Sequence, residues 1–313
     1  MTAQPTPQTP DISVCICTFR RPEQLQALLT RLGQQQPVPG LPHCEIVVVD
    51  NDPAHSARPV LQALATQLPL RYVHLPQANI SAARNAAIRL AQGQWLAWID
   101  DDELPEPNWL FELAQTQRTH AADVVFAPVL PVYPAQISPW LRTGGYYERP
   151  RFATGTVIGI SDARSGNVWI RAQALADLPG PFDTAFGTTG GEDSLLFRQL
   201  QARGLKFIWC DSAPVHEALP PDRAQPRWLL QRSYRVGQIW MRCELHALQG
   251  ASRIRRAWGL GLRAGVQLGV ALVLAGLCWP LSRTRGFHWL RTAWAQAGKL
   301  SALFGQRQHA YGQ

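Results

Sequence analysis

Four short apolar segments alternate with helical patterns in the first hundred residues of this 313-residue chain. They are residues 12–18, 45–50, 70–74 and 95–99. All have the length of strands, and all but the shorter segment 70–74 are apolar enough to be buried on both faces. Strands that alternate with helices of ten or more residues predict a mostly parallel sheet with helices on both faces. The sequence therefore predicts an α/β fold.

Polar residues follow these strands at the points where the strands end. Thr18 ends the first strand, Asp50 and Asn51 end the second, and an acid run at residues 100–103 follows the fourth. Because parallel strands end at one edge of a sheet, these residues are expected to meet. Adjacent carboxylates repel one another, and Mg²⁺ or Mn²⁺ with a bound diphosphate would relieve the repulsion. An acidic cap on the helix that follows is the alternative.

Within the acid run, Asp100 and Asp102 are separated by one residue. In an extended segment these two side chains would share a face while Asp101 points elsewhere. Both are therefore candidate metal ligands.

Glycine-rich phosphate loops are absent from the ends of these strands. Neither G-x-G-x-x-G nor G-x-x-x-x-G-K-[ST] occurs there, and the first hundred residues contain no lysine. This disfavours a Rossmann dehydrogenase and a P-loop enzyme. It also disfavours a nucleotidyltransferase, which would show a glycine- and lysine-rich loop early in the chain.

Four segments of the first half resemble the family 2 glycosyltransferases in order and spacing. They are residues 13–22, 46–51, 83–85 and 99–103, and the resemblance covers residues 11–218. It implies a GT-A fold, a nucleotide-sugar donor (a UDP-sugar is favoured) and Mg²⁺ or Mn²⁺ as cofactor. It implies donor-binding residues at Thr18, Asp50, Asn51, Asn79, Arg84, Asp100, Asp101 and Gly166. It makes Asp102 the leading metal ligand and also adds His216 to the metal ligands, although a lone histidine is more often structural.

An acid pair, Glu192 and Asp193, follows Gly190 and Gly191 at the start of a predicted helix. The helix dipole stabilises a carboxylate there in the ionised form that a general base needs. By the resemblance, Asp193 deprotonates the acceptor hydroxyl and Glu192 supports it. A purely structural alternative is that both acids cap the helix.

The middle of the chain predicts further strands at residues 123–127, 156–160, 167–171 and 206–210. The irregular segment 128–151 contains Trp140, Tyr146 and Tyr147. These aromatic side chains either stack on sugar rings or pack in the core.

Basic residues gather after residue 222. Residues 223–313 contain 14 Lys and Arg and one acid, Glu244, a net charge of 14 − 1 = +13, whereas residues 1–222 have a net charge of 16 − 21 = −5. Such a basic part binds nucleic acid or an anionic membrane. Residues 265–281 contain no charge, which nucleic-acid binding would not need and which approaches the length of a bilayer span. A membrane surface is therefore predicted as the partner, and nucleic acid is not.

Arginines on both sides of this apolar run leave the positive-inside rule undecided. An interfacial or re-entrant hairpin, followed by an amphipathic helix at 287–304, fits better than a clean crossing, and a buried core helix is the alternative. Residues 225–228 are similar to part of the Q-x-x-R-W signature of membrane polysaccharide synthases, although Ala224 replaces its glutamine. This similarity implies acceptor contacts by Arg227 or Trp228.

The sequence thus predicts a disordered segment 1–10, a GT-A domain 11–222 and a basic, helical, membrane-associated region 223–313. Residues 1–10 lack the charge and apolar pattern of a secretory signal, and the cysteines lie in apolar runs without metal spacing. We therefore expect a metal-dependent, inverting glycosyltransferase on the cytoplasmic face of the inner membrane. Its acceptor would be lipid-linked or a cell-envelope polysaccharide. A non-catalytic nucleotide-sugar or glycan-binding subunit of a polysaccharide assembly complex is the alternative.

Overall fold

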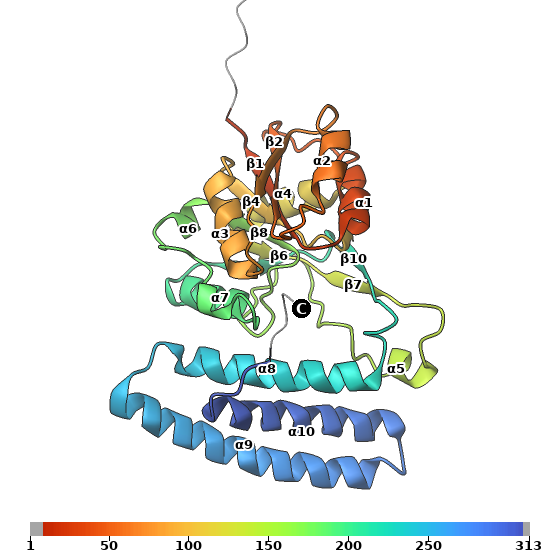
Figure 1. Cartoon of the computed structure of the whole chain (residues 1–313), viewed down its shortest axis with the longest axis vertical. Coiled ribbons are helices and arrows are strands. Elements are labelled where there is room, and N and C mark those ends of the chain that lie inside the picture. Colours follow the sequence, from red (N-terminus) through yellow and green to blue (C-terminus); the bar gives the residue numbers. More distant parts are fainter. Residues whose placement is uncertain (1–8, 309–313) are drawn as a thin grey trace, which may run out of the picture.

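A seven-stranded sheet with the order β3-β2-β1-β4-β8-β6-β9 forms the centre of the fold (Figure 1). The computed structural model describes residues 9–308, so most of the predicted disordered segment 1–10 lies outside the described residues. The strands are β1 (Ile12–Thr18), β2 (Cys44–Asp50), β3 (Leu70–His74), β4 (Trp95–Trp98), β6 (Val124–Phe126), β8 (Val168–Arg171) and β9 (Phe207–Trp209). Only β8 runs antiparallel to its neighbours in this sheet. The predicted mostly parallel sheet is confirmed.

A second, three-stranded sheet has the order β5-β10-β7. Its strands are β5 (Glu103–Pro105), β7 (Val129–Val132) and β10 (Val215–Ala218). β10 runs antiparallel to β5, and Glu217 lies opposite Glu103 in their register. This pairing brings a late part of the chain to the end of the acid run.

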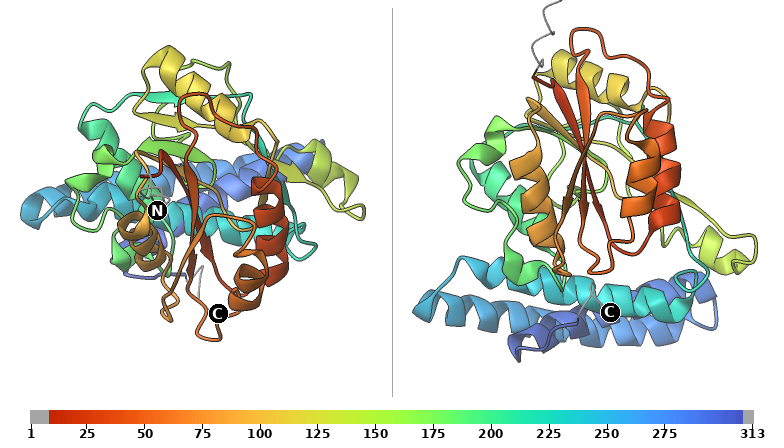
Figure 2. Two further views of the ribbon diagram at one scale, coloured as in Figure 1. Left: turned by 90° about the horizontal axis from the view of Figure 1, so that it is seen from above. Right: turned by 45° about the horizontal axis from the view of Figure 1, so that its top comes forward.

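Helices cover both faces of the main sheet, as Figure 2 shows. On one face lie α1 (Pro22–Leu32), α2 (Arg58–Leu64) and α4 (Trp109–His120), and on the other lie α3 (Ile80–Leu90), α6 (Gln173–Ala176) and α7 (Glu192–Ala202). The helices begin where the sequence favours it. Proline occupies the first turn of α1, and the Asn79 side chain accepts a hydrogen bond from the backbone N–H of Ala82 at the start of α3. Short helices α5 (Pro139–Thr143) and η1 (Thr184–Phe186) complete this part.

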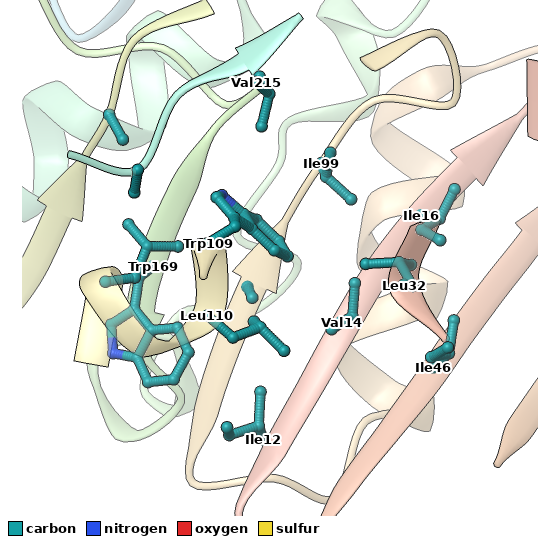
Figure 3. Packing of buried hydrophobic residues seen from close by; sticks show 14 of the residues in the cluster. Ile12, Val14, Ile16, Leu32, Ile46, Ile99, Trp109, Leu110, Trp169 and Val215 are labelled. Atoms are coloured by element: carbon teal, nitrogen blue, oxygen red, sulfur yellow. The ribbon is translucent and has the colours of Figure 1, made fainter. Parts of the chain in front are cut away.

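Trp109 of α4 is fully buried and is, with Trp169, one of the two largest side chains of the buried core cluster drawn in Figure 3. Its indole N–H donates to Asn167 Oδ1 at 2.8 Å. The Asn167 amide in turn donates to the backbone carbonyls of Pro128 (3.0 Å) and Ala213 (2.9 Å). A buried polar side chain with all these partners holds its backbone in one place. The core therefore positions Gly166, the residue that precedes Asn167.

The expected strand at residues 156–160 is wrong. The structure forms only an isolated bridge there, between Val157 and Ile208. Val157 is exposed instead of buried, and Gly155 before it has φ +92°, a value outside the extended region. The apolar composition suggested a strand, but backbone hydrogen bonds join the segment to β9 only between residues 155 and 158, too few for a regular strand.

Three long helices form a layer beside the two sheets (Figure 1). They are α8 (Pro226–His246), α9 (Gly250–Cys278) and α10 (Arg283–Leu303), and α10 packs along both of the others. A Cβ on Gly237 of α8 would lie 2.0 Å from the Ala295 carbonyl oxygen, and one on Gly298 of α10 would lie 1.9 Å from the Tyr234 carbonyl oxygen. The two backbones therefore approach closely only because glycine occupies both positions.

α9 is the helix of the described residues that is long and apolar enough to cross a membrane by length and composition. Its most apolar 18-residue window has a mean hydropathy of 1.7, and 22% of that window is buried. The buried residues are small or face the neighbouring helix: Leu260, Ala264, Ala271 and Ala275. Most of the apolar surface of α9 is therefore left without a protein partner in the described part of the chain.

Candidate active site

A cavity of about 420 Å³ lies between the ends of the strands and α8. Carboxylates from several separate segments line it: Asp100, Glu103, Glu192, Asp193 and Glu217. The lining also includes aromatic and basic side chains from the segment 128–151 and from α8: Tyr147, Arg149, Trp228, Arg232 and Arg235. The fold thus brings both predicted acid groups, near residues 100 and 192, to a single cavity.

The acid run forms a turn instead of an extended segment. Thr18 Oγ1 donates to Asp101 Oδ2 at 2.8 Å, and Arg21 Nη1 donates to Asp101 Oδ1 at 2.8 Å and to Asp102 Oδ2 at 2.7 Å. The extended backbone from which a shared face of Asp100 and Asp102 was expected is therefore not formed. Burial raises the pKa of Asp101 to about 6, with Arg21 opposing the rise.

Arg84 of α3 connects the acid run to α7. Its Nη1 donates to Glu192 Oε1 at 2.5 Å, and its Nη2 lies 3.6 Å from Asp100 Oδ1. Arg84 and Glu192 are both buried, whereas nearly half of the Asp100 side chain is exposed. Burial raises the pKa of Glu192 to about 7, and Arg84 opposes this rise. Arg84 thus holds Glu192 in an internal ion pair and leaves Asp100 facing the cavity.

Asp193 lies in the first turn of α7, one residue after Glu192. Its Oδ1 accepts a hydrogen bond from the backbone N–H of Ser194 at 2.6 Å. Gly190 and Gly191 before it have φ +80° and +101°, and a Cβ on Gly191 would lie 2.6 Å from Cγ2 of Ile239 in α8. Only glycine allows this turn together with this contact, so the predicted helix start is confirmed and places Asp193 at the cavity.

Gly166 packs directly on the carboxylates of the acid run. A Cβ there would lie 2.5 Å from Glu103 Oε1 and 3.3 Å from Asp100 Oδ2. Glu103 Oε2 accepts a hydrogen bond from the backbone N–H of Asp100 at 3.0 Å. Burial raises the pKa of Glu103 well above its usual range, and the Asp100 carboxylate adds to the rise. Any larger residue than glycine at 166 would displace these acids.

Three other residues predicted to bind the donor hold backbone segments near the ends of the strands. Asp50 is fully buried, and its two carboxylate oxygens accept hydrogen bonds from the backbone N–H groups of Asp52 (3.0 Å) and Ala57 (3.1 Å). Asn51 is buried beside Thr18, whose carbonyl accepts its backbone N–H. Asn79 caps α3 and donates to the Thr184 carbonyl at 3.1 Å. These three side chains do not line the cavity.

The structure does not bring His216 to the acid run. In β10, Glu217 lines the cavity, whereas His216 Nε2 lies 2.9 Å from Glu106 Oε1. Neighbouring strand residues point to opposite faces, so both cannot face the cavity. The sequence analysis did not single out Glu217. Alternation in this short strand means that either His216 or Glu217 faces the cavity, so the signal was available. Burial raises the pKa of Glu217, and Asp102 adds to the rise.

The chemistry of the acid run suits a divalent cation. Asp100 and Asp102 offer hard oxygen ligands, the kind that Mg²⁺ and Mn²⁺ take when a diphosphate supplies others. Within residues 9–308, no group of three or more His, Cys, Asp or Glu side chains could hold a metal ion by itself. These carboxylate ligands therefore fit a metal ion that a bound substrate also coordinates.

α8 presents one face to the cavity. Trp228, Arg232 and Arg235 line it, at the spacing of one helix face, whereas Arg227 is exposed outside the lining. The Tyr147 ring stacks on Trp228 with centroids 6.3 Å apart. The short match to Q-x-x-R-W pointed to the start of this helix, but the arginines four and seven residues after Trp228 carry no such signal.

The aromatic residues of the segment 128–151 pack mainly against one another and against α10. The Phe287 ring lies 5.2 Å from both Trp140 and Tyr146, and the Tyr146 hydroxyl donates to the Thr284 carbonyl at 2.7 Å. Of the three aromatics singled out in the sequence, only Tyr147 lines the cavity. Packing thus accounts for the other two.

Comparison with known proteins points in one direction. The family model described as Glycosyl transferase family 2 matches residues 13–178. The Succinoglycan biosynthesis protein ExoM of Rhizobium meliloti is 34% identical over 307 residues, which cover 96% of this chain and 95% of that protein. Validoxylamine A glucosyltransferase of Streptomyces hygroscopicus is 27% identical over 248 residues, 68% of this chain and 54% of its own.

Solved structures agree on the fold. The mannosyltransferase PcManGT of Pyrobaculum calidifontis, solved with GDP-Man and Mn²⁺, aligns over 96% of this chain and 89% of its own, with a TM-score of 0.64 and 17% identity. S. aureus TarS 1–349, solved with UDP, aligns over 95% and 92% with a TM-score of 0.54 and 17% identity. The GT-A fold expected from the sequence is confirmed. With a family model over more than half of its length and a relative similar from end to end, the chain belongs to glycosyl transferase family 2.

Proposed function

We propose that this glycosyltransferase moves a sugar from a nucleotide-sugar donor to a lipid-linked or cell-envelope polysaccharide acceptor, with inversion and with Mg²⁺ or Mn²⁺. The observation that carries the proposal is that Asp193 and Asp100 line one cavity from two separate elements. The names of the relatives support it: a succinoglycan biosynthesis protein, and structures solved with UDP-GlcNAc or with GDP-Man and Mn²⁺.

The proposed reaction is a single displacement. Asp193 takes the proton from the acceptor hydroxyl, whose oxygen attacks the anomeric carbon while the bond to the nucleoside diphosphate breaks. The N-terminus of α7 stabilises the negative charge of this base. The Arg84–Glu192 ion pair holds the start of α7 in position. A divalent cation bound by Asp102 and Asp100 would neutralise charge on the departing diphosphate.

Donor binding is proposed at the edge formed by the predicted residues. Thr18, Asp50 and Asn51 lie behind the acid run, where Thr18 donates to Asp101. Arg84, Asp100 and Gly166 line the cavity itself. A UDP-sugar is the proposed donor. The acids within the cavity would repel a diphosphate without a cation, which is the physical reason for linking the metal to the donor.

Donor binding is therefore expected to depend on metal. UDP with Mg²⁺ or Mn²⁺ at about 100 times its Kd should add roughly 2.7 kcal/mol to the unfolding free energy, and UDP with EDTA should add much less. Asp102→Asn should weaken the metal-dependent gain, and Asp177→Asn, an exposed residue after α6, should leave it intact. The measurement is a thermal-shift series over nucleotides and metals. Equal shifts with and without metal would contradict the proposed cofactor.

The helical layer is proposed to rest on the cytoplasmic face of the inner membrane. Exposed apolar residues recur every three or four positions along α9: Trp258, Leu262, Val266, Val270, Val273 and Leu277. Arginines precede and follow this stripe in the sequence. An apolar stripe with basic ends suits an interfacial helix on anionic lipid, and the packing of α10 along α9 favours that arrangement over a clean crossing.

Charges placed on this stripe are expected to release the protein from lipid. Leu262→Glu with Leu277→Glu should lower partitioning into phosphatidylglycerol-containing vesicles by about tenfold or more, since each exposed leucine gains roughly 1.5–3 kcal/mol on burial. Val157→Glu alters an equally exposed apolar residue outside the layer and should have no effect. Vesicle flotation gives the measurement. If the double variant partitions like the wild type, α9 does not contact the lipid.

A further inference from the structure

Arginines crowd the part of the cavity that α8 forms. Arg232 and Arg235 come from α8 and Arg149 comes from the segment after α5. We refer to these three residues as the arginine cluster. The proposed reaction uses none of them, because donor and base are assigned to the strand ends and to α7. A second charged group of a substrate could therefore occupy this part of the cavity.

Arg232 shows how strongly positive the cluster is. Its guanidinium carbon lies 5.2 Å from the Trp228 ring centroid, and the side chain is partly buried. Burial, together with the positive charges of Arg149, Arg235 and Arg291, lowers the pKa of Arg232 to about 10, while Glu217 opposes the fall. Crowded like charges in a partly buried place are unfavourable unless an anion neutralises them.

Carboxylates share the cavity with the cluster, but two of the arginines have none in direct contact among the described residues. Over residues 9–308, neither Arg149 nor Arg232 forms an ion pair with a carboxylate. Glu217 is the facing acid, and it lies 3.7 Å from Arg223, another basic residue of the lining. Guanidinium groups bind phosphate oxygens in a planar, two-pronged geometry, so several of them in one cavity suit a phosphate or diphosphate.

Two members of the cluster, Arg232 and Arg235, lie on a different element from the donor edge, whereas Arg149 also interacts with Asp100. Asp100 and Gly166 lie at the strand ends, whereas Arg232 and Arg235 lie on the helix that packs against α10 and through it against the apolar α9. An anion held by the cluster would therefore lie between the catalytic carboxylates and the layer proposed to contact the membrane. That is the place for the charged group of an acceptor whose other end is in the lipid.

We propose that the arginine cluster binds the diphosphate group of a lipid-linked acceptor and so directs the sugar hydroxyl toward Asp193. This inference rests on the proposed function, because it assigns part of the same cavity to the acceptor. It makes Arg232 and Arg149 specificity-determining residues for a charged acceptor. The donor diphosphate remains with the acid run.

The test measures binding of three probes to the full-length protein in detergent: farnesyl diphosphate, farnesol and UDP with Mg²⁺. Farnesyl diphosphate should bind much more tightly than farnesol. Arg232→Gln and Arg149→Gln should each weaken the binding of farnesyl diphosphate by about tenfold or more, as expected for loss of a charge-assisted hydrogen bond. The binding of UDP should stay unchanged. Arg89→Gln, an exposed arginine in the last turn of α3, is the matched control and should change neither.

Two outcomes would overturn the inference. If UDP binding falls as much as farnesyl diphosphate binding, the cluster serves the donor diphosphate. If farnesyl diphosphate binds no better than farnesol, or if both cluster variants behave like Arg89→Gln, no diphosphate site exists there. Arg149 is exposed, so its variant keeps the test valid even if Arg232→Gln fails to fold. Metal-dependent UDP binding by the wild-type protein would persist in either case and leave the proposed function standing.

Discussion

Asp193→Asn is expected to lower the rate of sugar transfer by about 10²–10⁴-fold, the usual contribution of a positioned general base. An asparagine side chain cannot accept the proton of the acceptor hydroxyl. It keeps an oxygen that can accept the hydrogen bond from the Ser194 backbone N–H, so the start of α7 should survive. The loss should appear in kcat, with metal-dependent UDP binding unchanged.

The control for this variant is Asp177→Asn, the same exchange at an exposed position outside the cavity, which should retain wild-type kcat. A rate within a few-fold of wild type for Asp193→Asn would exclude this residue as the base.

Arg84→Met is expected to destabilise the fold by about 3–5 kcal/mol, because it leaves the buried Glu192 carboxylate without its counter-charge. The guanidinium also lies over the Phe182 ring at 5.4 Å, so methionine keeps part of the packing. The double variant Arg84→Met with Glu192→Gln removes both charges and should recover most of the loss. Urea unfolding of the wild type, the single variants Arg84→Met and Glu192→Gln, and the double variant measures the cycle.

The pH dependence gives this prediction a second readout. The folded pKa of Glu192 is raised to about 7 from the usual 4.5, so the folded state binds more protons than the unfolded state between these values. Stability from this group therefore falls as pH rises through that window. Without Arg84 the pKa rises further and the loss extends to higher pH, so Arg84→Met should be weakest above pH 7. Equal stability of this variant and wild type at pH 8 would show that the ion pair contributes nothing.

The strand ends illustrate what the sequence could predict. Thr18 and Asp101 are 83 residues apart, yet their predicted meeting is confirmed by a hydrogen bond, because β1 and β4 are neighbours in the sheet. Strand order follows from short-range rules of βα folding. Contacts that depend on strand order can therefore be anticipated from the sequence alone.

Details of side-chain direction could not be predicted in the same way. Asp100 and Asp102 pair with different arginines where the backbone turns after β4, and a turn has no period from which to infer these partners. His216 was expected at the site, but Glu217 lines the cavity instead, because one step of register in β10 decides which of the two faces it. Both details depend on where the backbone turns and on the register of a short strand, which the neighbouring strands determine.

The basic lining escaped prediction for a different reason. Arg149 belongs to an irregular segment and Arg232 to a helix that begins more than seventy residues later. Their proximity depends on how α8 packs against the two sheets, and no periodic pattern records that packing. Tyr147 and Trp228, which stack on one another, meet by the same route.

The close contact of Gly237 with α10 has a consequence for the modularity of the molecule. Cutting the chain after α8 would remove both α10, whose backbone lies against Gly237, and α9, so α8 would lose the two helices that pack against it. The sheet part and the helical part therefore differ from domains joined by a linker. Both include α8, so a chain cut after this helix is not expected to yield two independently folded parts.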